Sequence, residues 1–397
     1  MSKNGNNNGV KPTGGIKTSV ELFCGIGGFR TAADKVGIKT VWANDIEPKA
    51  CHVYRDRFEE PLKEGDIHAF IKDVPPHDLL SGGFPCQPFS SAGKKLGVRD
   101  PRGTLFQAIV QVIESHQPKF FVLENVRRLL SMENGCHFAT IIMALTRLGY
   151  RVEWRLLNAM SFGLAQNRQR IVIVGTRESA NIITSILAPQ LDLRSLRDPE
   201  LESVHDQKLW LPLERHGERF PTWGLAQGDK FVSFDLPTFS ESKPAVLLAD
   251  ILQNDVPIQF DFTHSMESRL AQNDEVCRFV GGVEILGNQA GGARMGYTVF
   301  GTRGVAPTLT ASTSRHYERY KVGQSFRRLT NVEYARLQGF PDDHCSSVSV
   351  YDQYSLFGNA VPPQLVEWVL RRLQGERSAI PTPTTSQLPL FYGENTK

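Results

Sequence analysis

The sequence predicts an α/β protein with a doubly wound, mostly parallel sheet and a smaller, irregular second domain. Three observations predict this class. Short apolar runs alternate with helical patterns as far as residue 177, as they do in repeated βαβ units. A glycine-rich turn at residues 25–28 follows the first apolar run, where doubly wound sheets bind nucleotide-type ligands. After Arg177 the alternation stops, and Pro, Gly and charged residues are scattered as far as residue 290.

The alternating segment gives the expected elements in order. We expect strands at residues 17–23, 40–43, 78–81, 119–123, 152–157 and 170–174. We expect helices at residues 29–36, 47–58, 104–116 and 137–148, then two more at 331–338 and 362–372. Gly37 and Gly149 follow two of these helices, as is typical of helix C-termini. The last two strands have no helical pattern between them, which predicts an antiparallel pair at the edge of the sheet.

The composition is that of an ordinary globular protein. The 397 residues leave room for two or three domains, with 40% apolar and 22% charged residues. No apolar run approaches the roughly 18 residues of a membrane-spanning helix, and residues 1–18 lack the apolar core of a secretory signal. None of the six cysteines stands in a C-x-x-C pair, which predicts free thiols, no metal site and a reducing cytoplasmic location.

The pattern divides the chain into four parts. We expect disorder at residues 1–17 and 377–397, a cofactor-binding and catalytic domain at 18–177 plus 325–376, and a second domain at 178–324. The net charge of +3 indicates no nucleic-acid partner by itself. Residues 294–328, however, hold seven Arg or Lys residues and one Glu, which indicates either a polyanion partner or a solvated charged face.

The glycine-rich turn has the features of a nucleoside site. Asp45 ends the second expected strand, 20 residues after Gly25, the spacing of a carboxylate that accepts hydrogen bonds from ribose hydroxyls. Arg30 stands where a dinucleotide fingerprint would have its third glycine. The turn therefore suits a nucleoside cofactor better than a dinucleotide, and a purely structural glycine turn is the alternative.

A cysteine and a carboxylate follow two other strands. Cys86 lies between Pro85 and Pro88, and such a stiff loop favours a nucleophile over an inert core thiol. Glu124 ends an apolar strand, where a carboxylate needs a partner or a function. If the two strands are neighbours, both groups lie at the sheet edge that carries the glycine turn. A helix cap or an ion-pair partner is the alternative for Glu124.

Two arginines stand at the start of the last strand. Arg168 and Arg170 are two residues apart on an extended segment, so their side chains point the same way. They are suited to orient an anion or a base edge, and a solvated pair is the alternative.

Taken in order, these motifs resemble those of the DNA (cytosine-5) methyltransferases, of the prokaryotic restriction–modification type. The resemblance covers nearly the whole chain. It rests on Phe23-x-Gly25-x-Gly27, Asp45-Ile46, Gly65-Asp66-Ile67, Pro85-Cys86-Gln87, Glu124-Asn125-Val126, Gln166 to Arg170, Arg303 to Thr310, and Gly358 to Pro362. Ile46 departs from the pattern, because an aromatic residue often stands there.

The resemblance implies the S-adenosylmethionine-dependent methyltransferase fold and that cofactor. It implies that Cys86 adds to cytosine C6, that Glu124 acts at N3, and that Arg168 and Arg170 hold the base at O2. Cofactor contacts are implied for Phe23, Gly25, Gly27, Asp45, Ile46, Asp66, Ile67, Pro85, Leu105 and Asn359.

The implied partner is double-stranded DNA, from which the target cytosine must be flipped out. Residues 178–324 would then read the target sequence. The expected DNA contacts are Lys94, Arg99, Arg102, Arg303, Thr308 and Arg315. We further expect a monomer near the bacterial nucleoid, paired with a restriction endonuclease and with no membrane partner. The alternatives are a transfer-RNA methyltransferase, an inactive DNA-binding relative and, remotely, a nicotinamide oxidoreductase.

Overall fold

The computed structural model describes residues 15–59, 61–85, 104–177, 185–189, 191, 202–203, 219–228, 230–237, 246–271, 277–288, 298–311 and 318–376. The terminal segments expected to be disordered lie outside these ranges, apart from residues 15–17. Ile16 is buried beneath the main sheet and therefore belongs to the folded part.

The large sheet in the described residues has ten strands in the order β3-β2-β1-β4-β5-β7-β6-β9-β10-β8. The first five in that order are parallel, and each later strand is antiparallel to its neighbour. The parallel strands are β1 (Thr18–Leu22), β2 (Lys39–Asp45), β3 (Leu62–Glu64), β4 (Leu79–Gly83) and β5 (Phe120–Val126). The others are β6 (Arg151–Asn158), β7 (Gln169–Thr176), β8 (Glu202–Ser203), β9 (Trp223–Gln227) and β10 (Lys230–Phe234).

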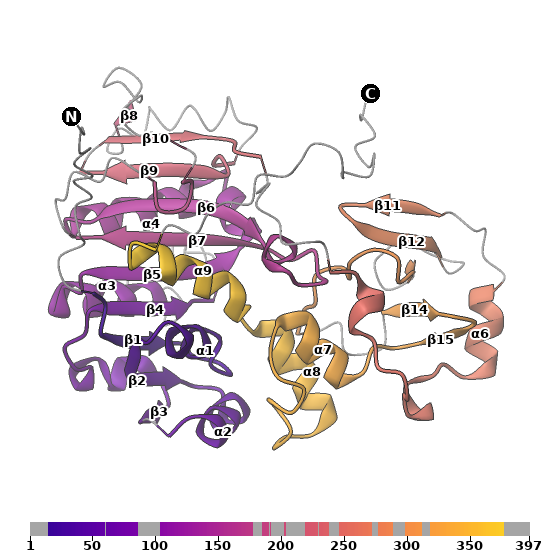
Figure 1. Cartoon of the computed structure of the whole chain (residues 1–397). Helices are drawn as coiled ribbons and strands as arrows, with labels where there is room; N and C mark the ends of the chain where they lie inside the picture. The colour runs from indigo at the N-terminus through magenta and orange to yellow at the C-terminus, as the bar shows by residue number, and fades with distance from the viewer. Residues whose placement is uncertain are drawn as a thin grey trace, which may run out of the picture.

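Helices cover both faces of this sheet, which confirms the predicted doubly wound α/β class (Figure 1). Alternate residues of β5 show how the faces divide. Val122 packs in the cluster that holds α1 (Gly28–Lys35) and α9 (Pro363–Leu373). Phe121 packs in the cluster that holds α3 (Thr104–His116) and α4 (Cys136–Arg147). Helix α2 (Pro48–Arg57) joins β2 to β3. The central strands are therefore apolar on both faces, as a covered parallel sheet requires.

The prediction that β6 and β7 form the edge of the large sheet is wrong. Strands β6 and β7 do pair antiparallel, but β9 pairs with the free side of β6, so neither strand is at the edge. Strands β8, β9 and β10 come from residues 178–324, so part of that segment extends the large sheet. Phe220 packs 5.0 Å from Phe138 and 6.0 Å from Trp154 between ring centroids, and a Cβ on Gly224 would come within 2.0 Å of the Trp154 ring. The hairpin strands are short, and their sequences show no regular alternation.

Within the described ranges, the small sheet has five strands in the order β11-β12-β13-β14-β15, and it lies beside the large sheet (Figure 1). Its elements are β11 (Arg278–Val280), β12 (Val283–Asn288), β13 (Thr298–Phe300), β14 (Arg319–Val322), β15 (Ser325–Arg327) and the accompanying helix α6 (His264–Ala271). Strand β15 belongs here, although residue 325 was expected to begin the return to the catalytic domain. Among the described residues, no helix is both long and apolar enough to span a bilayer.

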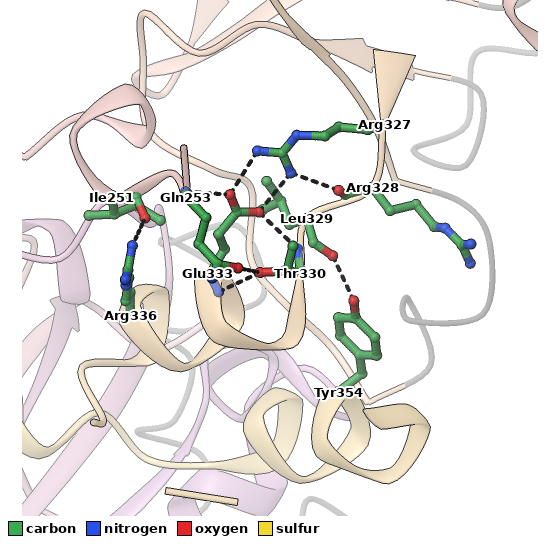
Figure 2. Close-up of polar contacts among 9 residues, drawn as sticks. All are labelled: Ile251, Gln253, Arg327, Arg328, Leu329, Thr330, Glu333, Arg336 and Tyr354. Carbon is green, nitrogen blue, oxygen red and sulfur yellow. Dashed lines mark hydrogen bonds and ion pairs between the residues drawn. The ribbon is translucent and has the colours of Figure 1, made fainter. Parts of the chain in front are cut away.

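A buried ion pair joins the small sheet to helix α7 (Asn331–Gln338), as Figure 2 shows. Arg327 ends β15, and its Nη2 lies 2.7 Å from Oε1 of Glu333, with the two side chains 5% and 0% exposed. The Glu333 carboxylate also accepts from the backbone N–H groups of Thr330 (2.8 Å) and Gln253 (2.9 Å). The next helix, α8 (Val350–Asn359), is tied to the same junction by the hydroxyl of Tyr354, which donates to a backbone carbonyl at 2.7 Å.

Candidate active site

A cavity of about 520 Å³ opens at the carboxyl ends of β1, β2, β4 and β5. This is the edge at which doubly wound sheets bind their ligands. Apart from Gly27, every predicted cofactor residue lines it: Phe23, Gly25, Asp45, Ile46, Asp66, Ile67, Pro85, Leu105 and Asn359. The described catalytic candidates Glu124, Arg168 and Arg170 line the same cavity. One cavity therefore brings together residues from seven separate motifs.

The glycine turn is held to the end of β2 by Asp45. Its Oδ2 accepts from the Gly25 N–H at 2.7 Å, and its Oδ1 accepts from the Glu47 N–H at 2.8 Å. Burial raises the pKa of Asp45, although these backbone N–H groups act in the opposite direction. Phe23 and Gly25 both have left-handed backbone conformations, with φ of 55° and 53°. The carboxylate predicted to contact a ribose thus also shapes the turn.

Two glycines let the chain pass close to the start of α1. Gly27 has φ of 84°, and a Cβ there would come within 2.3 Å of the Phe58 ring. A Cβ on Gly28 would come within 2.3 Å of the Val361 carbonyl oxygen. This close approach brings Asn359, at the end of α8, to the cavity. The structure therefore places Gly27 at the helix start, and not among the residues that line the cavity.

Glu124 is a buried residue in the lining of the cavity. Strands β4 and β5 are neighbours, with Gly83 opposite Glu124. This is the strand pairing on which the expectation of a shared sheet edge for Glu124 and the Cys86 loop depended. Oε1 of Glu124 accepts from Nε of Arg170 at 2.7 Å. Burial raises the pKa of Glu124, while Arg170 and Arg168 oppose that rise. The site therefore holds a carboxyl group that can carry a proton at a higher pH than a carboxyl group in water.

The two arginines have different hydrogen-bond partners. Arg170 lies diagonally across from Glu124 on the paired strands β5 and β7, which explains their contact. Arg168 points its guanidinium at three buried carbonyls instead: Nη1 donates to Leu309 (2.7 Å), and Nη2 donates to Gly358 (3.0 Å) and Ala360 (2.8 Å). Both arginines nevertheless line the same cavity, and the expectation that their side chains point the same way stays a prediction.

The loop that leads to Cys86 is held by Asn125. Its Nδ2 donates to the Phe84 carbonyl at 2.8 Å, and Pro85 lines the cavity. The sequence reasoning did not single out Asn125 as a site residue, although its position directly after Glu124 at a strand end was a usable signal. Five predicted residues lie outside the described ranges: Cys86, Lys94, Arg99, Arg102 and Arg315. In the part of the chain that is described, no three His, Cys, Asp or Glu side chains gather as a metal site would require.

The family described as C-5 cytosine-specific DNA methylase matches residues 17–375. The chain belongs to this family. It is 46% identical over 159 residues to Type II methyltransferase M.NgoBI of Neisseria gonorrhoeae, a match that spans 40% of this chain and only 50% of that relative. It is 31% identical to Type II methyltransferase M1.ScrFI of Lactococcus lactis subsp. cremoris, over 89% of this chain and 77% of the relative. The solved S. pombe Dnmt2 methyltransferase shares the fold, with a TM-score of 0.59 at 16% identity over 90% of this chain and 98% of that one.

In this member of the C-5 cytosine-specific DNA methylase family, the basic stretch at residues 294–328 has fewer unpaired positive charges than its charge count indicates. Arg303 pairs with Glu284, Nη2 to Oε1 at 2.6 Å, and the carboxylate is 1% exposed. Arg327 pairs with Glu333, as described above. Both acidic partners lie outside the counted stretch, so a charge count within the stretch could not include them.

Thr308 has a structural contact within the methyltransferase. Its hydroxyl donates to the Asn167 carbonyl at 2.5 Å, beside the cavity. Residues 306–309 therefore pack along the segment that carries Arg168, and the predicted DNA contacts at Arg303 and Thr308 stay predictions.

Proposed function

We propose that this chain is a sequence-specific DNA methyltransferase that converts one cytosine of its target sequence to 5-methylcytosine. The observation that supports it best is the shared cavity, in which the Glu124–Arg170 pair faces the glycine turn. The Type II methyltransferase relatives favour a restriction–modification role, which includes a cognate endonuclease. Duplex DNA is the proposed substrate, and the bacterial cytoplasm, close to the nucleoid, is the proposed location.

The cavity suits S-adenosylmethionine. Its volume of about 520 Å³ falls in the range of small-molecule sites. Ile46 is 65% exposed although it lines the cavity, so a flat adenine ring would cover an otherwise unfavourable apolar surface. Asp45 and Asp66 supply carboxylates for hydroxyl and amino groups, and Asn359 lies where the chain returns to the cavity. When bound, the cofactor supplies an electrophilic methyl group attached to a sulfonium sulfur.

The proposed chemistry begins at Cys86, the residue after cavity-lining Pro85. Cytosine C5 is a poor nucleophile, and addition of the Cys86 thiolate to C6 moves an electron pair onto C5. Protonated Glu124 donates to N3 and so stabilises the negative charge that develops there. Arg170 holds Glu124 in place and offers a cation beside the base. Once C5 carries the methyl group, its proton leaves to water and the Sγ–C6 bond breaks, which restores the Cys86 thiolate.

One chain supplies every residue that lines the cavity, so we propose that a monomer is sufficient for methylation. The target base must leave the duplex to reach Glu124, because a stacked cytosine cannot enter a cavity at a sheet edge.

The test is transfer of labelled methyl from S-adenosylmethionine to unmethylated genomic DNA, with wild type beside Cys86→Ala. We expect label on DNA with the wild type only, and bisulfite sequencing should place it on cytosine within one short motif. Transfer RNA is incubated in parallel. Label on RNA alone, or on neither nucleic acid while the cofactor still binds, would contradict the proposal.

A further inference from the structure

A second hollow of about 460 Å³ adjoins the cavity and shares Val126 and Arg170 with it. We call it the arginine groove. It is lined by Val126, Arg127, Arg128, Asn167, Gln169, Arg170, Val283, Pro307, Thr308 and Thr310. Its lining residues come from the end of β5 and the turn after it, from the start of β7, from β12 and from residues 307–310.

The groove is strongly positive. Three arginines line it, and none of its lining residues carries a carboxylate. On the side of the cavity, Arg170 is already bound to the Glu124 carboxyl group. Arg127 and Arg128 are exposed on the short helical turn η4 (Arg127–Ser131), and within the described residues neither contacts a carboxylate. Among the described residues, these two positive charges beside the base site therefore have no acidic partner.

The walls of the groove are held in place by their own hydrogen bonds. Nη1 of Arg127 donates to Oε1 of Gln169 at 2.8 Å. The Asn167 side chain donates to the Gly281 carbonyl at 2.8 Å and accepts from Asn158 at 2.8 Å. The arginine groove thus exists before any ligand arrives, which lowers the entropic cost of binding.

We propose that Arg127 and Arg128 bind the DNA phosphates next to the flipped cytosine. This inference rests on the proposed function. A flipped nucleotide stays attached to its neighbours, so its phosphates must lie just outside the cavity that receives the base. The arginine groove borders that cavity, and guanidinium, amide and hydroxyl groups are those that bind DNA phosphates. These contacts position the strand and read no sequence.

The experiment measures the affinity of Arg127→Gln, Arg128→Gln and the double variant for two labelled duplexes over a range of salt concentrations. One duplex contains the motif that the wild type methylates, and the other lacks it. We expect each single variant to bind both duplexes about tenfold more weakly. Each lost phosphate contact should reduce the slope of log K against log salt by about 0.9, and the double variant should lose about twice that.

Matched variants separate a specific contact from a general charge effect. Arg147→Gln removes an exposed positive charge from the end of α4, and it should leave the slope and the methylation rate unchanged. Arg128→Lys keeps the charge and should keep most of the slope. Cofactor binding by each variant shows that it is folded.

Three results would overturn the inference while the proposed function stands: slopes equal to that of wild type, a loss of slope no larger than that of Arg147→Gln, or weakening confined to the duplex with the motif. If the wild type transfers no methyl group to DNA, the proposed function fails, and this inference fails with it.

Discussion

Replacing Arg168 by methionine should disturb the cofactor site more than the chemistry at the base. Methionine keeps the apolar stem of the side chain and removes the three hydrogen bonds to Leu309, Gly358 and Ala360. A hydrogen bond from a charged donor contributes about 1.5–3 kcal/mol, so three give an upper range of about 4.5–9 kcal/mol. The cost of burying the guanidinium offsets part of this, and we expect a net loss of about 3–5 kcal/mol.

The lost bonds hold the turn that carries Asn359. We therefore expect Arg168→Met to weaken cofactor binding at least tenfold, about 1.4 kcal/mol of the total loss, and to lower stability in urea. Arg170→Met, which loses the ion pair with Glu124, should instead lower kcat by about 10²–10³ with little change in cofactor affinity. Calorimetry with the cofactor and single-turnover methylation separate the two variants.

The reasoning would be refuted if Arg168→Met bound the cofactor like wild type, was as stable, and lost only kcat. Both arginines would then act on the base alone. If Arg168→Met fails to fold, Arg168→Lys serves as the second variant, because it keeps a charge that reaches fewer carbonyls. An intermediate cofactor affinity is then expected, and an unchanged one contradicts the argument.

Three further predictions concern buried acidic groups. Glu124→Gln removes the proton donor and should slow single-turnover methylation about 10²–10⁴-fold, and a loss below threefold would contradict the role. Burial raises the pKa of Glu21 from 4.5 to about 8, so its contribution to stability is full below pH 4.5 and is lost as pH rises to about 8. The free energy of unfolding should fall by up to about 5 kcal/mol over this pH range. Urea unfolding of Glu21→Gln should not show this fall, and equal pH profiles for the variant and the wild type would contradict the prediction. Arg327→Met leaves the Glu333 carboxylate buried without its cation and should lower the free energy of unfolding in urea by about 3–5 kcal/mol. Arg336→Met breaks a half-exposed pair and should lower it by about 0–1 kcal/mol. Equal losses for the two variants would refute the distinction.

The sequence predicted the elements whose signals are local. The helices at α3 (Thr104–His116) and α7 (Asn331–Gln338) match their expected ranges, because apolar spacing and a capping pair mark them within a few residues. Helix α8 (Val350–Asn359) was missed, although the motif at its end was noticed. The glycine turn and Asp45 were identified from position alone, because they stand at strand ends, which meet at one edge of a parallel sheet. Other cofactor candidates, such as Leu105 in α3 and Asn359 at the end of α8, came from the family resemblance.

What the sequence could not show depends on pairing over long distances. The partners of Arg168 are 141–192 residues away along the chain, so no local pattern distinguishes it from Arg170. The acidic partner of Arg303 lies 19 residues upstream, outside the basic stretch. Strand β9 pairs with β6 across more than 60 residues, and its short sequence gives a weak signal. A charge count or a periodicity describes a single segment, whereas these roles depend on which other segments contact it in the folded chain.

The small sheet and the cofactor site depend on the same short segment, residues 165–168. The Ala306 N–H donates to the Ala165 carbonyl at 2.8 Å, and the Asn167 N–H donates to the Ala306 carbonyl at 2.8 Å. From this segment, the Arg168 side chain donates hydrogen bonds to the carbonyls on either side of Asn359. A shift of residues 303–310 on DNA binding must therefore move the backbone of Arg168 or break these bonds. Because Arg168 also holds the turn at the cofactor cavity, DNA and cofactor should each change the affinity for the other by the same factor.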